Sequence, residues 1–441
     1  MIAEPLIENE TFKQLLESFL PQIEGSDPFD RFRKKAWHHF LSVGLPSKKM
    51  EAYRRIKLRP LFSQPFGLGI SAALSSTQVA DFVYPECRES LIVFVNGHYS
   101  IEHSNVGALP PQVVICSLQE ASETYGVLLN NYWTKSLKEE IDPFTLVNAA
   151  LHGLGAFVYL PPKTVVETPI QVLHILNEEN QPHMAMPRLH IFAGAQSDLH
   201  VISTQKNLTK STPYFVNQVT ECVLDEGSHL HYTQALCDEN PLSWHFDAIR
   251  ATLKRDSTFK SVCVTEGSAT VRKDYRILLT GDNSEALLSE TAMLSNKSEA
   301  HAHVWMEHQA PFCRSYQLFK NVLNDFSRSS FEGKIMVRQA AQKTEAFQLN
   351  NDLILSDHAH ADSKPNLEIF ADDVKASHGA TVGQLDSEQL FYLKTRGFSD
   401  AQAKNLLIYG FCEEVIEKIP LRSLRHEISS RARQYLTKNA I

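Results

Sequence analysis

The stretch from about residue 165 to 383 constrains the fold more than any other part of this chain. It is a succession of short alternating apolar and polar segments, such as 199–202 and 259–264, without the long periodicity of a helix. Small or hydroxyl residues precede the segments at intervals of 33, 29, 27, 14, 29, 17 and 15 residues. These residues are Ala195, Ser228, Ser257, Ser284, Ser298, Ser327, Thr344 and Ala359. The intervals are close to multiples of about 15, which indicates a coil of two strands repeated along an axis.

We therefore predict a flattened parallel β-helix over residues 165–385. A β-sandwich is the competing fold, because it also joins many short strands. A sandwich would show more Asn-Gly and Asp-Gly hairpin signals than this region contains.

Residues 1–164 are predicted to form a helix-rich N-terminal domain. An apolar stripe near the start indicates one helix, and a second is expected over 30–43, ending at Gly44-Leu-Pro46. A compact strand over 91–95 turns at Asn-Gly, and helical patterning resumes over 125–154.

Residues 386–441 are predicted to form a C-terminal helical domain. Asp386 and Ser399 stand where N-caps are expected, and Ser399 begins a Ser-x-x-Gln capping box. The segment from Leu406 to Ile419 is apolar around more than one face. Its second face is either core or a docking surface.

Charge and cysteine content argue against several classes of protein. Lys and Arg number 43 against 51 Asp and Glu, a net charge of −8, and no basic run suits direct nucleic-acid binding. The strongest apolar runs are far shorter than the roughly 20 residues that span a bilayer. The acidic N-terminal residues differ from signal and transit peptides and favour a cytoplasmic protein. The seven cysteines include no Cys-x-x-Cys pair, so no self-contained zinc or four-cysteine cluster site is evident.

Few motifs carry chemistry by themselves. The phosphate-binding loops of nucleotide-binding proteins are missing from the sequence, so we expect this chain to bind no nucleotide. Asp372 and Asp373 are typical of the paired carboxylates of a β-helical carbohydrate-active enzyme, but adjacent residues on a strand point to opposite faces. Three His-x-His pairs could each chelate a metal from one strand face, although we expect them to be polar surface residues. The pairs are His229 and His231, His301 and His303, and His358 and His360.

Several motifs, in order along most of the chain, identify a family. The longest is the segment 367–393, which contains Lys-Ala-Ser-His-Gly-Ala-Thr. The others are Gly44–Tyr53 with Leu58–Leu61, Phe331–Ile335, Gln348–Ser356, and Lys394–Gly397 with Gly410–Cys412. Together they resemble the SufD family, the scaffold subunits of the Suf iron–sulfur cluster assembly system.

The resemblance implies a right-handed β-helix between helical domains, and a scaffold rather than an enzyme. It implies pairing with a homologous SufB-type subunit through the β-helices, and a homodimer when the chain is isolated. It also implies a transient iron–sulfur cluster at the subunit interface and a SufC-type ATPase bound through the C-terminal helices. The residues expected to bind the ATPase are Leu406, Leu407, Tyr409, Phe411, Val415 and Ile416.

The resemblance further implies that His378 is a ligand of the nascent cluster. Neutral imidazole can bind iron in place of a thiolate, and a non-thiolate ligand suits a cluster that must later leave. Without the resemblance, His378 would be read as a locally hydrogen-bonded residue at the end of the last β-helix strand. Many members of the family have cysteine two residues earlier, where this chain has Ala376. The remaining thiolates are therefore expected from the partner, and a β-helical carbohydrate-active enzyme using Asp372 or Asp373 is the alternative function.

Overall fold

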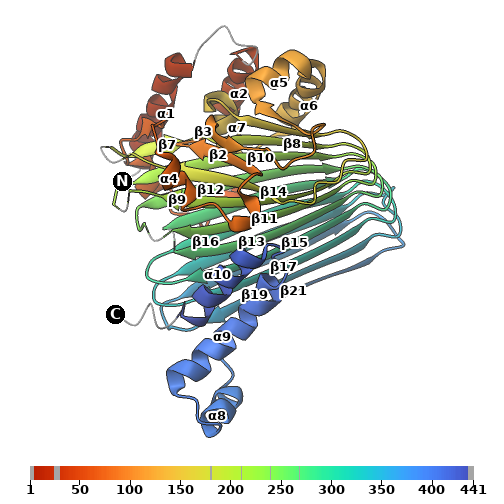
Figure 1. Ribbon diagram of the computed structural model, residues 1–441. Helices are drawn as coiled ribbons and strands as arrows, with labels where there is room; N and C mark the ends of the chain where they lie inside the picture. Colours follow the sequence, from red (N-terminus) through yellow and green to blue (C-terminus); the bar gives the residue numbers. More distant parts are fainter. Residues whose placement is uncertain are drawn as a thin grey trace.

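Alternating strands of this chain stack into two long sheets that face each other across a shared core (Figure 1). The computed structural model describes residues 4–23, 30–178, 181–209, 211–238, 240–267 and 269–435. Within these residues the sheets have 11 and 10 strands, and strands of successive coils are parallel. The prediction of a mainly β protein with a parallel β-helix between helical segments is confirmed.

We name the two sheets A and B. Sheet A holds β1 (Gly67–Leu68), β4 (Val114–Ser117), β5 (Ala156–Leu160), β7 (His183–Ala185), β8 (Arg188–Ala193), β10 (Tyr214–Leu224), β12 (Ser243–Leu253), β14 (Thr270–Leu279), β16 (Glu299–His308), β18 (Arg328–Val337) and β20 (His360–Ile369). Sheet B holds β2 (Leu91–Val95), β3 (His98–Asn105), β6 (Ile170–Leu176), β9 (Asp198–Asn207), β11 (His229–Asp238), β13 (Thr258–Gly267), β15 (Glu285–Leu294), β17 (Arg314–Leu323), β19 (Glu345–Ile354) and β21 (Lys375–Gly383).

Helices stand at both ends of the chain. The N-terminal ones are α1 (Glu4–Ile23), α2 (Asp30–Val43), η1 (Glu51–Tyr53), α3 (Arg59–Phe62), α4 (Ser76–Ala80), η2 (Pro85–Cys87), α5 (Leu118–Thr124), α6 (Gly126–Glu139) and α7 (Pro143–Leu151). The C-terminal ones are α8 (Ser387–Thr395), α9 (Asp400–Ile416) and α10 (Arg422–Arg433).

A recurring turn explains the spacing of hydroxyl residues in the sequence. Asp256 has a φ of 57°, and the buried Ser257 that follows donates its hydroxyl to the carbonyl oxygen of Lys254 at 2.7 Å. Equivalent hydroxyl-to-carbonyl bonds occur at Ser197, Ser228, Ser298 and Thr344. In the first of these turns Ser197, rather than the predicted Ala195, makes the bond. The hydroxyl hydrogen bond closes each turn within itself, so the backbone groups of the next strand can pair with the neighbouring strand of its sheet.

The space between the sheets is filled by columns of apolar side chains. Ala251, Ile277, Met306 and Ile335 occupy matched positions in four successive strands of sheet A, and all are buried. Because parallel register places the same face of each strand inward, every coil adds its own layer to this core.

Helices α1, α2 and α7 pack against the outer face of sheet A, whereas α4 packs against sheet B. Phe144 of α7 contacts Phe215 and Phe246, with ring centroids 5.4 and 4.9 Å apart. Strands β2 and β5, which precede residue 165, already belong to sheets B and A. The domain division at residues 164 and 165 stays a prediction.

The C-terminal helices α9 and α10 pack against the outer face of sheet B, whereas α8 projects away from it (Figure 1). Ile408 and Cys412 of α9 share a buried cluster with Val262 and Met293 of sheet B. Part of the C-terminal apolar run is therefore the protein's own core.

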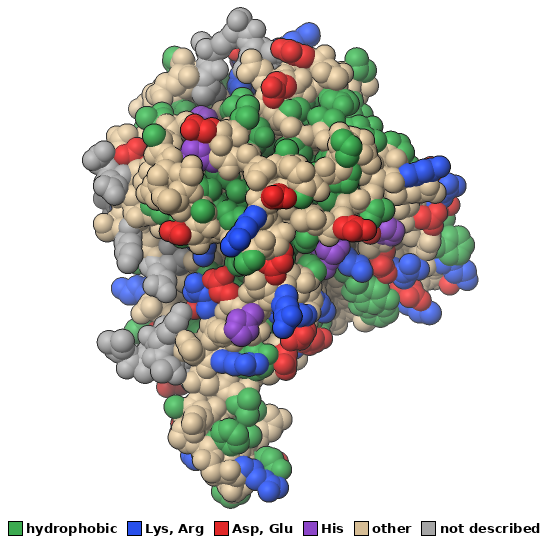
Figure 2. Space-filling view, in the orientation of Figure 1, with side chains coloured by type: hydrophobic (Ala, Val, Ile, Leu, Met, Phe, Trp, Pro, Cys, Tyr) green, Lys and Arg blue, Asp and Glu red, His purple; other side chains and the backbone are tan. Residues whose placement is uncertain are grey.

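The visible surface carries acidic and basic side chains interspersed with one another (Figure 2). Over the parts of the chain described above, none of the helices has both the length and the apolar character that crossing a membrane requires.

Candidate functional site

The last coil of the solenoid offers two unpaired strand edges. Among the described residues, β20 ends sheet A and pairs only with β18, while β21 ends sheet B and pairs only with β19. Neither strand contains a buried residue. The outer edges of these strands therefore present backbone N–H and C=O groups that another chain can bind.

His378 lies on β21 at this open end. It is exposed, and it stands in register with Gln348 of β19, which is only 2% exposed. Ala376, two residues earlier on the same face, packs against the core between the sheets. His378 therefore continues the inner face of sheet B at the point where the solenoid opens to solvent.

The interior beneath His378 is polar, unlike the core further inside. The amide of Gln348 donates from Nε2 to the Oε1 of Gln317 at 2.9 Å. Gly333 makes room for it, because a Cβ at that position would lie 2.1 Å from Gln348 Nε2. Asp352 follows on the same strand, and burial raises the pKa of its carboxyl. Hydrogen bonds from Asn321, Ser329 and Asn350 oppose this rise in the pKa. Gly333, Gln348 and Asp352 lie in the motifs 331–335 and 348–356, whose sequence alone predicted no role for them.

The other sequence candidates do not assemble into a catalytic site. Asp372 and Asp373 are both exposed, and Asp373 forms an ion pair with Lys343 in a turn.

The His-x-His pairs on β11 and β16 lie on strands as predicted, whereas His358 lies in the turn before β20. His301 and His303 contact different partners. His301 Nδ1 lies 2.7 Å from Ser330 Oγ, and His303 Nδ1 lies 2.6 Å from Asp274 Oδ1. His358 stacks on Phe326 with ring centroids 4.7 Å apart. Over the described ranges, no three His, Cys, Asp or Glu side chains are grouped so that they could hold a metal ion.

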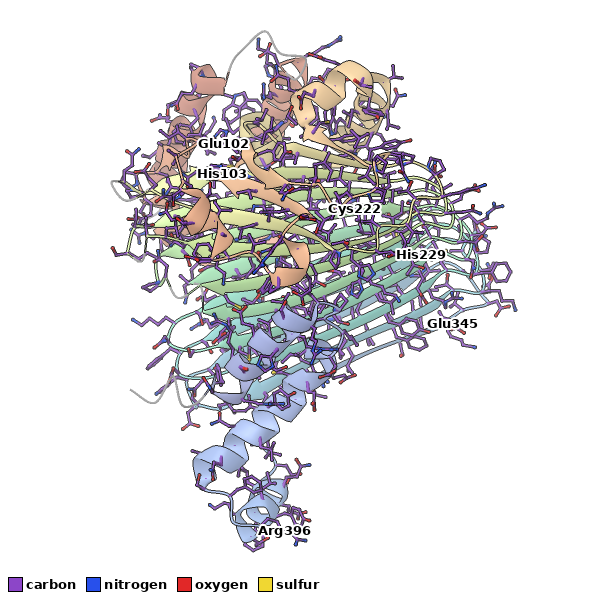
Figure 3. The ribbon with its side chains drawn as sticks, in the orientation of Figure 1. Glu102, His103, Cys222, His229, Glu345 and Arg396 are labelled. Atoms are coloured by element: carbon purple, nitrogen blue, oxygen red, sulfur yellow. The ribbon has the colours of Figure 1, made fainter. Side chains whose placement is uncertain are left out.

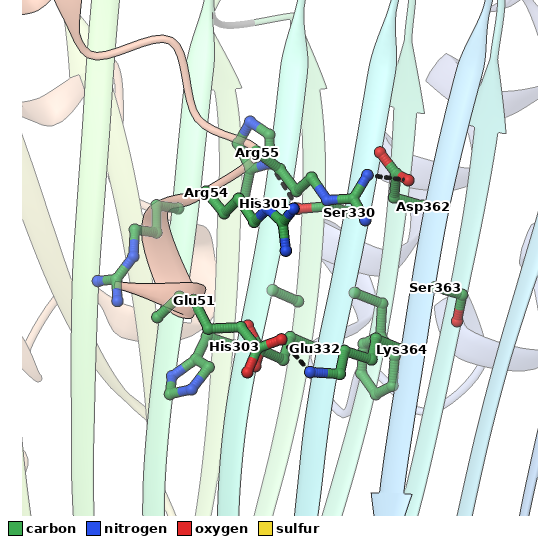
Figure 4. Close-up of a pocket in the computed structure, with 14 residues that line it drawn as sticks. Glu51, Arg54, Arg55, His301, His303, Ser330, Glu332, Asp362, Ser363 and Lys364 are labelled. Carbon is green, nitrogen blue, oxygen red and sulfur yellow. Dashed lines mark hydrogen bonds and ion pairs between the residues drawn. The ribbon is translucent and has the colours of Figure 1, made fainter. Parts of the chain in front are cut away.

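A small cleft on the outer face of sheet A was not foreseen from the sequence (Figure 4). Helix η1 and the residues that follow it cover the last coils there, with ion pairs from Glu51 to Lys364 and from Arg55 to Asp362. The first pair joins residues 313 positions apart, which no local pattern could indicate. It explains why the motif near residue 50 accompanies the motifs of the last coils: the two regions are in contact.

Most of the thiols lie far along the solenoid from the open end or beneath the helices, and Cys313 is buried in the turn before β17, two strands from β21. Burial raises the pKa of Cys263 to about 12 and of Cys412 to about 11. Cys222 lies inside the solenoid (Figure 3), between sheets. These thiols are buried and protonated, so they are poor candidates for metal ligands.

The residues expected to bind an ATPase divide into two groups. Tyr409, Val415 and Ile416 are buried in the cluster that attaches α9 and α10 to sheet B. Leu406 is 43% exposed, and Leu407 and Phe411 are half-buried. The first group is already engaged within this chain, whereas the second reaches the surface.

An exposed apolar patch accompanies Leu406 at the tip of the C-terminal helices. It consists of Phe391, Tyr392, Phe398 and Leu406, which are 70%, 55%, 42% and 43% exposed. Arg396 beside it projects away from the solenoid (Figure 3), with its guanidinium 5.0 Å from the centre of the Tyr392 ring. The apolar pattern of residues 406–419 did not predict that Phe391, Tyr392 and Phe398, which precede it, belong to the exposed patch.

Comparison with known proteins shows to which family this chain belongs. The model of the SufBD protein N-terminal region matches residues 8–172, and the SufBD core domain of SUF system FeS cluster assembly matches residues 174–411. The chain belongs to the SufBD family.

Its relatives in this family include both types of subunit. The iron–sulfur cluster assembly protein SufD of Escherichia coli is 30% identical over 91% of each chain. A SufBD family protein of Synechocystis is also 30% identical, over 87% of this chain and 86% of its own. The iron–sulfur cluster assembly protein SufB of Bacillus subtilis is 23% identical over 76% of this chain and 73% of its own.

Proposed function

We propose that this chain is a scaffold subunit of an iron–sulfur cluster assembly complex. In this proposal it pairs with a SufB-type subunit, binds a SufC-type ATPase, and contributes His378 as a ligand of the nascent cluster. The observation that carries the proposal is an exposed histidine on β21, the strand whose outer edge is unpaired at the end of a SufBD-family β-helix.

Pairing with the partner takes place at the open end. The free edges of β20 and β21 suit addition of further strands from a second β-helix, with main-chain hydrogen bonds across the junction. A SufB-type chain fits because this chain is similar along most of its length to a protein of that name. The same edges allow two copies of this chain to pair when the partner is missing.

The cluster is cargo that the complex builds and passes on. His378 would supply one imidazole nitrogen to iron. Ala376 brings no second ligand to the same face, and the buried thiols lie elsewhere in the fold. The other ligands therefore come from the partner subunit, which makes the site dependent on assembly of the complex.

The ATPase binds the apolar patch formed by Phe391, Tyr392, Phe398 and Leu406. These side chains lie on α8, on the start of α9 and in the turn between them, and α8 buries none of its residues in this chain. Because α9 continues from the patch to its packed contacts on sheet B, movement of the ATPase can reach the scaffold through one helix.

The test of the cluster site is His378→Ala in the reconstituted complex. The side chain is exposed, so expression, subunit pairing and ATPase binding should be unchanged, while iron and acid-labile sulfide per complex fall. His360→Ala is the matched control, because His360 is exposed on β20 at the same end and its side chain contacts Asp362. Unchanged iron and sulfide in an intact His378→Ala complex would show that His378 is not a ligand.

A gain-of-ligand variant provides a second arm. Ala376→Cys places a thiolate two residues from His378 on the same strand face. In the His378→Ala background it should restore part of the lost iron, since sulfur ligands hold iron–sulfur clusters well. Release of the cluster to an acceptor protein should become slower.

A further inference from the structure

We propose that Gln348 is a positioning residue that orients the imidazole of His378 for iron binding. The inference rests on the proposed function, because it concerns the same candidate ligand. Gln348 does not contact the cluster in this proposal. Its amide oxygen accepts one ring N–H of His378, which leaves the second ring nitrogen unprotonated and directed toward the open end.

Register brings the two residues together. Gln348 and His378 are paired positions of β19 and β21, so their side chains leave the same face of sheet B. Neighbouring strands lie roughly 4.8 Å apart, which is within reach of a side-chain hydrogen bond. The imidazole is exposed at the end of the solenoid and can rotate about its side-chain bonds toward the amide.

The amide of Gln348 is held with its oxygen available. Its Nε2 donates to Gln317 one coil further in, at 2.9 Å, which fixes the orientation of the group. Its Oε1 is buried and has no hydrogen-bond partner in this structure. A buried carbonyl oxygen without a donor is costly, and the ring N–H of His378 is the donor available from the adjacent strand.

The shape of the interior preserves this arrangement. A Cβ at Gly333 would lie 2.1 Å from Gln348 Nε2 and 2.6 Å from Phe331 Cζ. Glycine at this position therefore keeps the space that the Gln348 side chain occupies. Histidines that bind metals commonly donate their second ring N–H to such an acceptor, which fixes the tautomer and the ring plane.

The test follows the tautomer of His378 in the full-length chain labelled with 15N-histidine. The signals are assigned by their absence in His378→Ala. We expect one tautomer with a hydrogen-bonded ring N–H in the wild-type chain and in Gln348→Glu, which keeps an acceptor oxygen and can accept from the unpartnered Nε2 of Gln317 when that amide turns over. Gln348→Met, of similar shape, should give the averaged shifts of a solvent-exposed imidazole. Averaged shifts in the wild-type chain would overturn the proposal, and this measurement needs no substitution at residue 348.

Cluster content supplies the functional readout. In the reconstituted complex at limiting iron, Gln348→Met should lower iron and sulfide at least twofold, and Gln348→Glu should restore them. Asn350→Leu is the matched control, because Asn350 is buried on the same face of β19 but stands in register with Ala380. If His378→Ala lowers iron and Gln348→Met does not, the positioning role is wrong while the ligand role stands. If His378→Ala has no effect, the ligand role itself fails.

Discussion

Replacement of Arg272 tests how the N-terminal region is held on the β-helix. Its guanidinium is buried between two carboxylates, with Nη2 2.7 Å from Asp142 Oδ2 and 2.8 Å from Asp274 Oδ1. It also lies 4.2 Å from the centre of the Tyr53 ring, whose hydroxyl donates to Asp142 at 2.6 Å. The guanidinium of Arg272 therefore contacts residues of three regions: helix η1, the start of α7 and strand β14.

The loss in the free energy of unfolding depends on the partners that Asp142 and Asp274 keep after Arg272→Met. Removing one partner of a buried ion pair costs about 3–5 kcal/mol, because the other charge remains buried. Asp274 retains Arg250 at 2.6 Å, and Asp142 retains its hydrogen bonds from Tyr53 and Thr145. We therefore expect the lower end of the range, a loss of about 3 kcal/mol in the free energy of unfolding.

The loss should depend on pH. Burial alone would raise the pKa of Asp274, but the charges of Arg272 and Arg250 outweigh it and hold that pKa well below its usual value. This ion pairing stabilises the wild-type protein fully above the unfolded pKa, near 3.9, and the benefit is lost progressively as the pH falls from there through the lowered pKa of Asp274 in the folded protein. The difference between wild type and Arg272→Met should therefore be largest near neutral pH and begin to shrink only below about pH 4.

Urea unfolding followed by circular dichroism measures this difference. Arg255→Met is the matched control: Arg255 lies in a turn of the same solenoid, its side chain is 59% exposed, and it pairs with Glu226 at 2.8 Å. An exposed pair contributes less than about 1 kcal/mol. A loss for Arg272→Met no larger than that for Arg255→Met would refute the reasoning.

Three further predictions concern the core, the turns and the docking patch. Burial raises the pKa of Glu290 to about 7, so ionisation of this carboxyl above that pH costs stability. Glu290→Gln should therefore raise the free energy of unfolding at pH 8 by about 2 kcal/mol. At pH 5 the same substitution should leave the free energy of unfolding nearly unchanged. Ser257→Ala should cost about 1 kcal/mol in urea unfolding, because a buried hydroxyl bond of the turn is lost. Phe391→Ser should weaken ATPase binding at least tenfold by calorimetry without changing the unfolding midpoint. Val127→Ser, a control on α6 where the side chain is 80% exposed against 70% for Phe391, should leave ATPase binding unchanged. Equal ATPase affinity for the two variants would place the docking site elsewhere.

Removal of residues 386–441 is less informative than these substitutions. Ile408 and Cys412 cover Val262 and Met293 of sheet B, so truncation would expose apolar surface. Loss of ATPase binding in the truncated chain would then be confounded with loss of folding.

The sequence by itself determined the repeating architecture, because the causes of the repeat are local. A hydroxyl such as Ser257 bonds to a carbonyl three residues earlier, and inward and outward residues alternate within each strand. The helix caps at Asp386 and Ser399 are equally local, and both accept the expected backbone N–H bonds. His378 was found by motif, which places it in a family and on a strand.

Only the tertiary structure decided which distant residues meet. Arg272 and Asp142 are 130 positions apart, and their ion pair depends on how α7 sits against β14. Gln348 lies beside His378 because one full coil returns the chain to the same register, and the length of that coil is set by turns rather than by either residue. The apolar run that includes Val415 could not reveal its own partner, because burial against sheet B and burial against another protein require the same apolar side chains.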